Sequence, residues 1–204
     1  MRTGVGAPTS MGKDQFTMGT LVMTRSQLQI AFATAATLGA LSLSAPASAA
    51  LKEGAVAPDF KASAALDGKT FDFKLSDALK KGPVVLYFFP AAFTSGCTKE
   101  AHEFAEATED FAKLGATVVG VTSGNVNRVA EFSKVECRDK FAVAADPDKA
   151  ISKSYDSVLP VVGYTDRVSY VIAPNGKIVL AYSAMNPDQH VSKTMDAVKA
   201  LKAR

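Results

Sequence analysis

Apolar runs bounded by glycine and proline mark the strands of this chain. Residues 84–89 form an unbroken apolar run that ends at Pro90. Such a run is typical of a strand with both faces buried, as in a sheet that helices cover on each side. Shorter apolar runs at 117–121 and 141–145 predict two further strands.

Between these strands the spacing of apolar residues becomes helical. After the first strand they recur every three or four residues, which predicts a helix over 94–114 with one buried face. The positions on that face are Cys97, Ala101, Phe104, Thr108 and Phe111. Further helices are predicted over 125–137, from Asp146-Pro147 towards Tyr155, and over 187–202.

Two turn signals complete the pattern. Leu66-Asp67-Gly68 predicts an early hairpin, and Pro174-Asn175-Gly176 predicts a hairpin between strands at 167–173 and 177–182. Strands and helices alternate through the middle of the chain, and a hairpin and a helix close it. This order indicates an α/β fold with a mixed central sheet flanked by helices.

The first 49 residues look like a targeting segment. Arg25 precedes an apolar stretch at 30–43, and Ala47-Ser48-Ala49 has the form of a signal-peptidase site. We therefore expect a signal peptide and N-terminal extension at 1–49, one domain at 50–204, and export, most simply to the periplasm. The apolar stretch is too short and too rich in alanine and serine for a lasting membrane span, so an uncleaved anchor is the lesser alternative.

The charge and the cysteine content exclude some classes of partner and of enzyme. The net charge of +3 comes largely from the first 49 residues, and the remainder is nearly neutral without a basic cluster, so we expect no nucleic-acid partner. Cys97 and Cys137 are the only cysteines, and no C-x-x-C occurs. This disfavours a disulfide isomerase or reductase of the thioredoxin type. In an oxidising compartment, free thiols tend to be paired, protected or catalytic.

Cys97 stands where the buried strand turns into the first helix. Backbone N–H groups in a first helical turn lack intrahelical partners and favour an anion, so they would stabilise a thiolate. Thr94 could cap the helix or reach a ligand, and Pro90 would shield one side. A thiolate and hydrogen-bond donors suffice to reduce a peroxide, so we expect no metal or organic cofactor. The alternative is that Cys97 is a small core residue.

The residues around Cys97 resemble a known signature. Pro90-x-x-x-Thr94-x-x-Cys97 is similar to the peroxidatic motif of the peroxiredoxin (AhpC/TSA) family, and residues 96–101 resemble its bacterioferritin-comigratory, or PrxQ, subgroup. Residues 57–60 and 186–191 also look like that subgroup, so the resemblance spans roughly 51–204.

The resemblance implies a thioredoxin-like fold and an antioxidant peroxidase that reduces hydrogen peroxide and organic hydroperoxides. Its active site would comprise Pro90, Thr94, Cys97 and Arg167, and a thiol donor such as a thioredoxin-like protein would recycle it. A guanidinium beside a thiolate would also hold the thiolate ionised on physical grounds alone. We expect a monomer or a weak homodimer.

The sequence departs from many PrxQ proteins five residues after Cys97, where His102 replaces a second cysteine. His102 lies about 140° around the helix from Cys97, so we expect it at the surface, and a metal site there lacks further ligands. Some PrxQ proteins place their resolving cysteine in the second helix, which makes Cys137 the candidate. The alternatives are a one-cysteine peroxidase recycled by an external thiol and a non-catalytic redox sensor.

Overall fold

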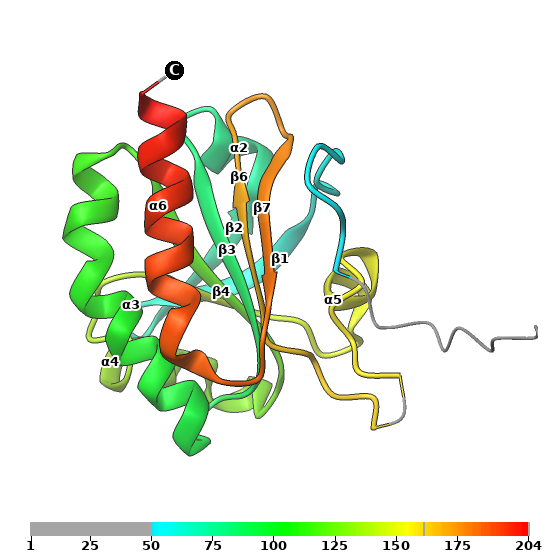
Figure 1. The fold of residues 1–204 in the computed structure, drawn as a ribbon. Helices are drawn as coiled ribbons and strands as arrows, with labels where there is room; N and C mark the ends of the chain where they lie inside the picture. Colours follow the sequence, from blue (N-terminus) through cyan, green and yellow to red (C-terminus); the bar gives the residue numbers. More distant parts are fainter. Residues whose placement is uncertain (1–49, 161, 204) are drawn as a thin grey trace, which may run out of the picture. The chain divides into compact units, whose positions relative to one another are not determined.

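A mixed sheet of seven strands organises the chain (Figure 1), and the computed structural model describes residues 50–160 and 162–203. The strands are β1 (Lys61–Leu66), β2 (Lys69–Lys74), β3 (Val84–Ala91), β4 (Thr117–Gly124), β5 (Ala142–Ala145), β6 (Val168–Ile172) and β7 (Ile178–Ser183). Their order across the sheet is β2-β1-β5-β4-β3-β6-β7. β3, β4 and β5 run parallel, and the other neighbouring pairs are antiparallel. The predicted fold class is therefore confirmed.

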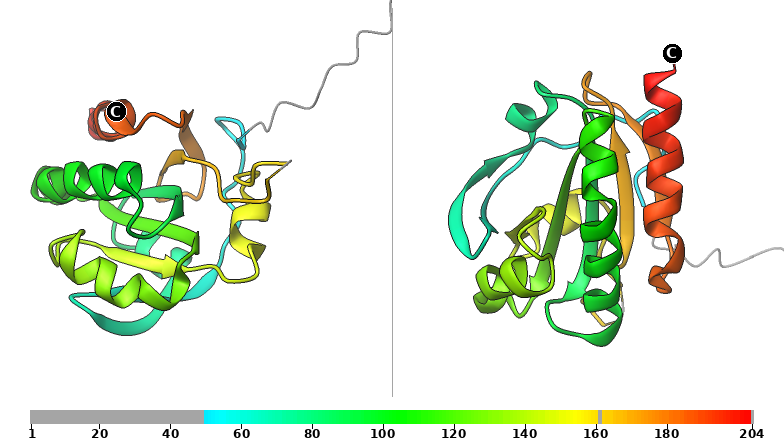
Figure 2. Two further views of the ribbon diagram at one scale, coloured as in Figure 1. Left: turned by 90° about the horizontal axis from the view of Figure 1, so that it is seen from below. Right: turned by 90° about the vertical axis from the view of Figure 1, so that its left-hand side faces the viewer.

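Helices cover both faces of the sheet. They are α2 (Leu75–Leu79), α3 (Ser95–Lys113), α4 (Val129–Val135), α5 (Ala150–Ser154) and α6 (His190–Lys202), with 3-10 turns η1 (Val126–Arg128) and η2 (Pro187–Gln189). Figure 2 shows α3, α4 and α6 on one side of the sheet. α2 and α5 contribute to a second core on the other side.

The strand β3 lies between β4 and β6, inside the sheet, which explains why its sequence is apolar without a break. Val85, Tyr87 and Phe89 point into the core beneath α3, α4 and α6. Val84, Leu86 and Phe88 alternate with them and point into the opposite core. Because both faces of β3 are buried, apolar residues occupy successive positions rather than alternate ones.

Both predicted hairpins are present, and the first shows why its turn sequence matters. Asp67 and Gly68 connect β1 to β2 with φ angles of 53° and 70°. A two-residue turn of this kind needs two left-handed residues, which aspartate-glycine supplies at low cost. The short helix α2 was not predicted, because its five residues are too few to show a repeated helical spacing of apolar positions.

The structure corrects the bounds of two predicted helices. The helix expected over 125–137 starts as the turn η1 and ends at Val135, because Arg138 and Asp139 adopt left-handed φ angles of 51° and 58°. Cys137 therefore lies in the loop after α4. The helix expected from Asp146 begins at Ala150 instead.

The cause of the second correction is the Asp146 side chain. Its carboxylate accepts hydrogen bonds from the backbone N–H groups of Ile151 and Ser152, at 3.1 and 2.8 Å. It therefore caps α5 from outside the helix. The last helix is confirmed from His190 onward, after the turn η2.

The predicted signal peptide at 1–49 lies outside the described residues, and its cleavage near Ala50 stays a prediction. Across residues 50–160 and 162–203, no helix combines the length and the apolar character needed to cross a membrane.

Candidate active site

The turn between β3 and α3 carries the candidate nucleophile. Phe93 in this turn has a φ of 63°, a conformation that non-glycine residues seldom adopt. The Asn125 side chain donates to the Ala92 carbonyl at 2.8 Å and so ties the turn to the end of β4. Cys97 follows in the first turn of α3 and is 1% exposed. Unpaired N–H groups of this turn favour negative charge on its sulfur.

Arg167 reaches the same sulfur from the residue before β6. Its Nη2 donates to Cys97 Sγ at 3.4 Å, its Nε donates to the Met185 carbonyl at 3.0 Å, and the whole residue is 3% exposed. Gly96 leaves the space for this contact, since a Cβ there would lie 3.2 Å from Nη2. The structure thus brings together two predicted site residues that are 70 positions apart.

A buried carboxyl group, Glu100, completes the arginine's contacts. Its Oε2 accepts a hydrogen bond from Arg167 Nη1, and the side chain is fully buried. Burial raises the pKa of Glu100 to about 8, although Arg167 opposes the rise. The sequence alone did not predict a role for Glu100. One sequence feature could have indicated that Glu100 is buried and paired. It lies three residues after Cys97, beside the apolar stripe of the predicted helix, and a carboxylate buried there needs a partner.

The predicted residues Thr94 and Pro90 precede Cys97 along the chain, at the start of α3 and near the end of β3. Thr94 takes the N-cap position of α3 by its backbone, but its hydroxyl donates to the Ala91 carbonyl at 3.1 Å and makes no cap bond. Side-chain capping by Thr94, one of its two predicted roles, is therefore wrong. Pro90 is half-buried near the end of β3, and its carbonyl accepts from the Thr122 hydroxyl at 3.3 Å.

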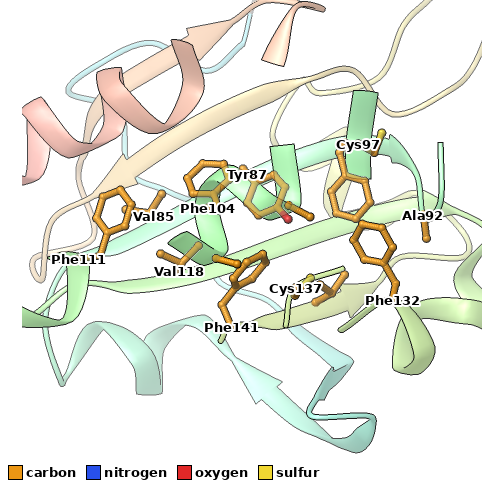
Figure 3. Close-up of a cluster of buried hydrophobic side chains, with 14 of the residues drawn as sticks. Val85, Tyr87, Ala92, Cys97, Phe104, Phe111, Val118, Phe132, Cys137 and Phe141 are labelled. Atoms are coloured by element: carbon orange, nitrogen blue, oxygen red, sulfur yellow. The ribbon is translucent and has the colours of Figure 1, made fainter. Parts of the chain in front are cut away.

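Cys137 lies in the same apolar cluster as Cys97, and both are free thiols. Figure 3 shows aromatic side chains between the two sulfur atoms in that view. Cys137 is 0% exposed, and burial raises the pKa of its thiol well above the ordinary value, with smaller contributions from Glu136 and Asp139. In this conformation Cys137 is a buried, protonated thiol.

His102 lies on α3, with its side chain 36% exposed, so it is at the surface as predicted but not free. Its Nε2 is 2.7 Å from a carboxylate oxygen of Glu136, the residue before Cys137. Among the residues that the structure describes, no group of three or more histidine, cysteine or acidic side chains could hold a metal ion.

Comparisons with known proteins agree with this geometry. The family model for the AhpC/TSA family matches residues 54–181. Chloroplastic peroxiredoxin Q of Populus jackii is 32% identical over 170 residues, which is 78% of this chain and 78% of that protein. The crystal structure of peroxidoxin BcpB from Mycobacterium tuberculosis is 29% identical with a TM-score of 0.68, covering 74% of this chain and 98% of that one.

A more distant structure supports the fold alone. PrxQ of Xylella fastidiosa is 23% identical with a TM-score of 0.66, and the match covers 75% of this chain and 98% of that one.

The family model spans more than half of the chain, so the sequence match and the shared fold lead to one conclusion. The chain belongs to the AhpC/TSA family of peroxiredoxins, and it is a thiol-dependent peroxidase with a thioredoxin-like fold.

Proposed function

We propose that Cys97 is the residue that attacks the peroxide and that Arg167 is its main electrostatic partner. The observation that carries this assignment is the contact of 3.4 Å between Arg167 Nη2 and Cys97 Sγ at the start of α3. A cation and a helix N-terminus at one sulfur both stabilise the thiolate, which is the reactive form.

The reaction needs no group beyond these side chains. The Cys97 thiolate attacks one peroxide oxygen, an S–O bond forms, and the O–O bond breaks. The bonding pair leaves with the second oxygen, which takes up a proton from the solvent to give water or an alcohol, and Cys97 becomes a sulfenic acid. Arg167 and the first-turn N–H groups donate to the oxygen that gains negative charge.

Peroxide consumption with dithiothreitol as reductant tests the assignment. We expect Cys97→Ser to lose turnover and Cys137→Ser to keep it, because dithiothreitol reduces a sulfenic acid directly. Cys137→Ser is the control for Cys97→Ser, since each variant removes one buried thiol. If Cys97→Ser retained most of the wild-type rate, Cys97 would not be the peroxidatic residue. Catalytic turnover by the wild type also separates an enzyme from a redox sensor.

For the second step, the proposal is that Cys137 resolves the sulfenic acid. The Cys137 sulfur would attack the Cys97 sulfur, water would leave, and an intramolecular disulfide would form, which a thioredoxin-like or other thiol donor then reduces by exchange. Cys137 is the other thiol of the chain and lies in a loop rather than in α4, so fewer helical bonds oppose its movement. Its burial means that this loop, the first turn of α3, or both must open.

Stoichiometric peroxide distinguishes this route from a one-cysteine mechanism. The wild type should give a cross-linked peptide that joins Cys97 to Cys137, visible by mass spectrometry. Cys137→Ser should accumulate sulfenic and then sulfinic acid at Cys97. Sulfenic acid alone, or a bridge between two chains, in the wild type would support an external thiol or a partner subunit instead.

We also infer export to the periplasm and a monomer or weak homodimer. The signal-like segment before residue 50 supports the first inference. N-terminal sequencing of protein from the native cell envelope should find a start near Ala50, and an intact leader in the cytoplasmic fraction would contradict export. Sedimentation of reduced and oxidised protein measures the oligomeric state.

A further inference from the structure

A cavity lies at the amino ends of the parallel strands, away from Cys97. Its volume is about 570 Å³, which is within the usual range of small-molecule sites. β3 and β4 begin their pairing at Val84 and Thr117, and Thr117 borders the cavity. Cys97 follows the opposite, carboxyl end of β3, and none of the predicted site residues lines the cavity. The peroxidase reaction therefore does not account for this space.

Two features of the fold leave the cavity open. β1 and β5 are joined by two residue pairs only, Ala64 with Ala144 and Ala65 with Val143. The right-hand view of Figure 2 shows the β1–β2 hairpin, in cyan to teal, curving away from the central strands. The helix α2, which borders the cavity through Ala78, has only five residues and so covers little of this face of the sheet.

The inner surface of the cavity is largely apolar. Phe73, Val119 and Phe141 contribute buried side chains to it. Leu66 and Phe71 also line it, although they are 38% and 42% exposed, so they are in contact with water while the cavity is empty. An apolar ligand would remove this surface from water, and the gain in free energy would grow with the area covered. The cavity thus suits an aliphatic chain.

The charged side chains that border the cavity leave an excess of positive charge. They are Asp72, Lys74, Asp77, Lys81 and Lys140. Asp77 already pairs with Lys80 at 2.7 Å. Lys140 already pairs with Glu109 at 2.9 Å. Within residues 50–160 and 162–203, the remaining two lysines and Asp72 form no ion pair. Two unpaired cations against one unpaired anion favour a ligand with a negative group.

We propose that this cavity binds an aliphatic chain that ends in an anionic group, namely a long-chain carboxylate. The chain would lie against Leu66, Phe71 and Phe73, and the carboxylate would face Lys74 and Lys81 at the rim. A lysine ammonium on its flexible stem can reach such a head group while it stays in water. The proposal does not depend on the role of Cys97.

Three probes with the same ten-carbon chain separate the apolar contribution from that of the charge. They are decanoate, 1-decanol and decyltrimethylammonium, each titrated by calorimetry into the full-length protein below its micelle concentration. We expect decanoate to bind about two- to tenfold more tightly than decanol, and the cationic probe to bind most weakly. Octanoate should bind at least about tenfold more weakly than decanoate, because each CH₂ group that leaves water contributes a factor of about four.

A charge placed on the apolar wall tests the position of the chain. Phe71→Asp should weaken the binding of decanoate at least about tenfold, because the aspartate would be desolvated beside the chain and would repel the carboxylate. Val56→Asp is the matched control, since Val56 is 70% exposed and does not line the cavity. It should leave the affinity within about twofold.

Removal of the two unpaired lysines tests the position of the carboxylate. Lys74→Gln combined with Lys81→Gln should weaken decanoate about three- to tenfold and leave decanol unchanged. Lys61→Gln combined with Lys69→Gln is the matched control, because these exposed lysines lie on the same hairpin but do not line the cavity. Peroxide turnover by every variant verifies that the fold is intact.

The proposal is overturned if decanoate does not bind at millimolar concentration, or if Phe71→Asp and Val56→Asp bind it as the wild type does. Equal affinity for decanoate and decyltrimethylammonium would overturn the choice of an anionic ligand. Dimerisation of the wild type that Phe71→Asp abolishes, measured by sedimentation, would also overturn the proposal. In that case a second copy of the chain, and not a carboxylate, covers the cavity.

Discussion

The surroundings of the two cysteines differ more than their burial does. Cys97 and Cys137 belong to one core cluster and are 1% and 0% exposed. Cys97 meets an arginine and the start of a helix, whereas Cys137 lies in an apolar pocket with acidic neighbours that raise its pKa further. Burial alone therefore does not make a cysteine either inert or reactive. Charge beside the sulfur acts as well: acidic neighbours add to the effect of burial at Cys137, whereas a guanidinium contacts the sulfur of Cys97.

The two sites also differ in how they are held. The turn before α3 is tied to β4 by hydrogen bonds within the core. The loop after α4 is fastened to the outside of α3 by three side-chain hydrogen bonds, which lie on successive turns of that helix. They are His102–Glu136 at 2.7 Å, Glu106–Arg138 at 3.2 Å and Glu109–Lys140 at 2.9 Å. We expect the Cys137 loop to be the easier of the two to release.

The largest expected effect is at Arg167. Arg167→Ala should slow peroxide attack between about 10-fold and 1,000-fold, because the buried guanidinium contacts the attacking sulfur and can donate to the oxygen that gains negative charge. Arg167→Lys should recover little of the loss, since lysine cannot contact Glu100, Cys97 and the Met185 carbonyl at once. Stopped-flow rates measure both variants.

An exposed cation close to the same turn provides the control for these rates. The guanidinium of Arg128 lies 3.8 Å from the centre of the Phe93 ring and pairs with Glu131. Arg128→Ala should leave the rate within about twofold, because solvent screens its charge. An equal loss in Arg128→Ala and Arg167→Ala would remove the special role of the buried arginine.

The second prediction concerns the pH dependence of stability at the Cys97 end. Glu100 has a folded pKa of about 8 against 4.5 in the unfolded chain, so the folded state binds more protons between these values. Its contribution to the free energy of unfolding therefore falls as the pH rises from 4.5 to 8. His190, with a pKa lowered from 6.5 to about 4, acts in the opposite direction below pH 6.5.

Of these two groups, only Glu100 changes the free energy of unfolding between pH 6.5 and 8, so its contribution can be measured separately in that interval. Denaturant unfolding should show stability decreasing there by roughly 1 kcal/mol per pH unit, and Glu100→Gln should flatten the slope. Other titratable groups also change the stability with pH, but they do so equally in the wild type and in Glu100→Gln. A slope that is unchanged in Glu100→Gln would mean that this carboxyl titrates as it does in the unfolded chain.

A third prediction compares a serine at the two cysteine positions. Cys137→Ser should lower the free energy of unfolding by about 1–3 kcal/mol, because the hydroxyl enters an apolar pocket without a partner. Cys97→Ser should cost less, since Arg167 and the helix N–H groups can bond to the hydroxyl. Urea unfolding of the reduced proteins measures the difference, and equal losses would show that the two pockets have similar polarity.

The smallest effect concerns the ion pairs that hold the Cys137 loop. Arg138→Gln combined with Lys140→Gln should speed Cys97–Cys137 disulfide formation by about two- to fivefold, because each exposed pair contributes less than about 1 kcal/mol. Asp110→Asn is the control, since it breaks an exposed pair of the same helix, with Lys113, away from the loop. A rate that is the same in both variants and the parent would exclude opening of this loop as the limiting step.

Local patterns carried most of the fold prediction. The apolar run of β3 and the helical spacing that follows it predict two adjacent elements with a boundary near Pro90. The position of Cys97 at the start of a helix could therefore be predicted from neighbouring residues. The Asp67-Gly68 turn was predictable for the same reason. The end of α4 was not, because it depends on the left-handed Arg138 and Asp139, which sequence spacing does not indicate.

The chemistry around Cys97 depended on long-range contacts. Arg167 was assigned from the family resemblance, and its three hydrogen-bonding partners appear only when β6 lies beside β3 and beneath α3. Glu100 could be noticed as a carboxylate on an apolar face, but neither its arginine nor His190, whose Nδ1 lies 3.6 Å from its Oε1, could be inferred from spacing. Propensity and periodicity act over a few residues, whereas the charge and protonation of a buried group depend on whatever the folded chain places around it.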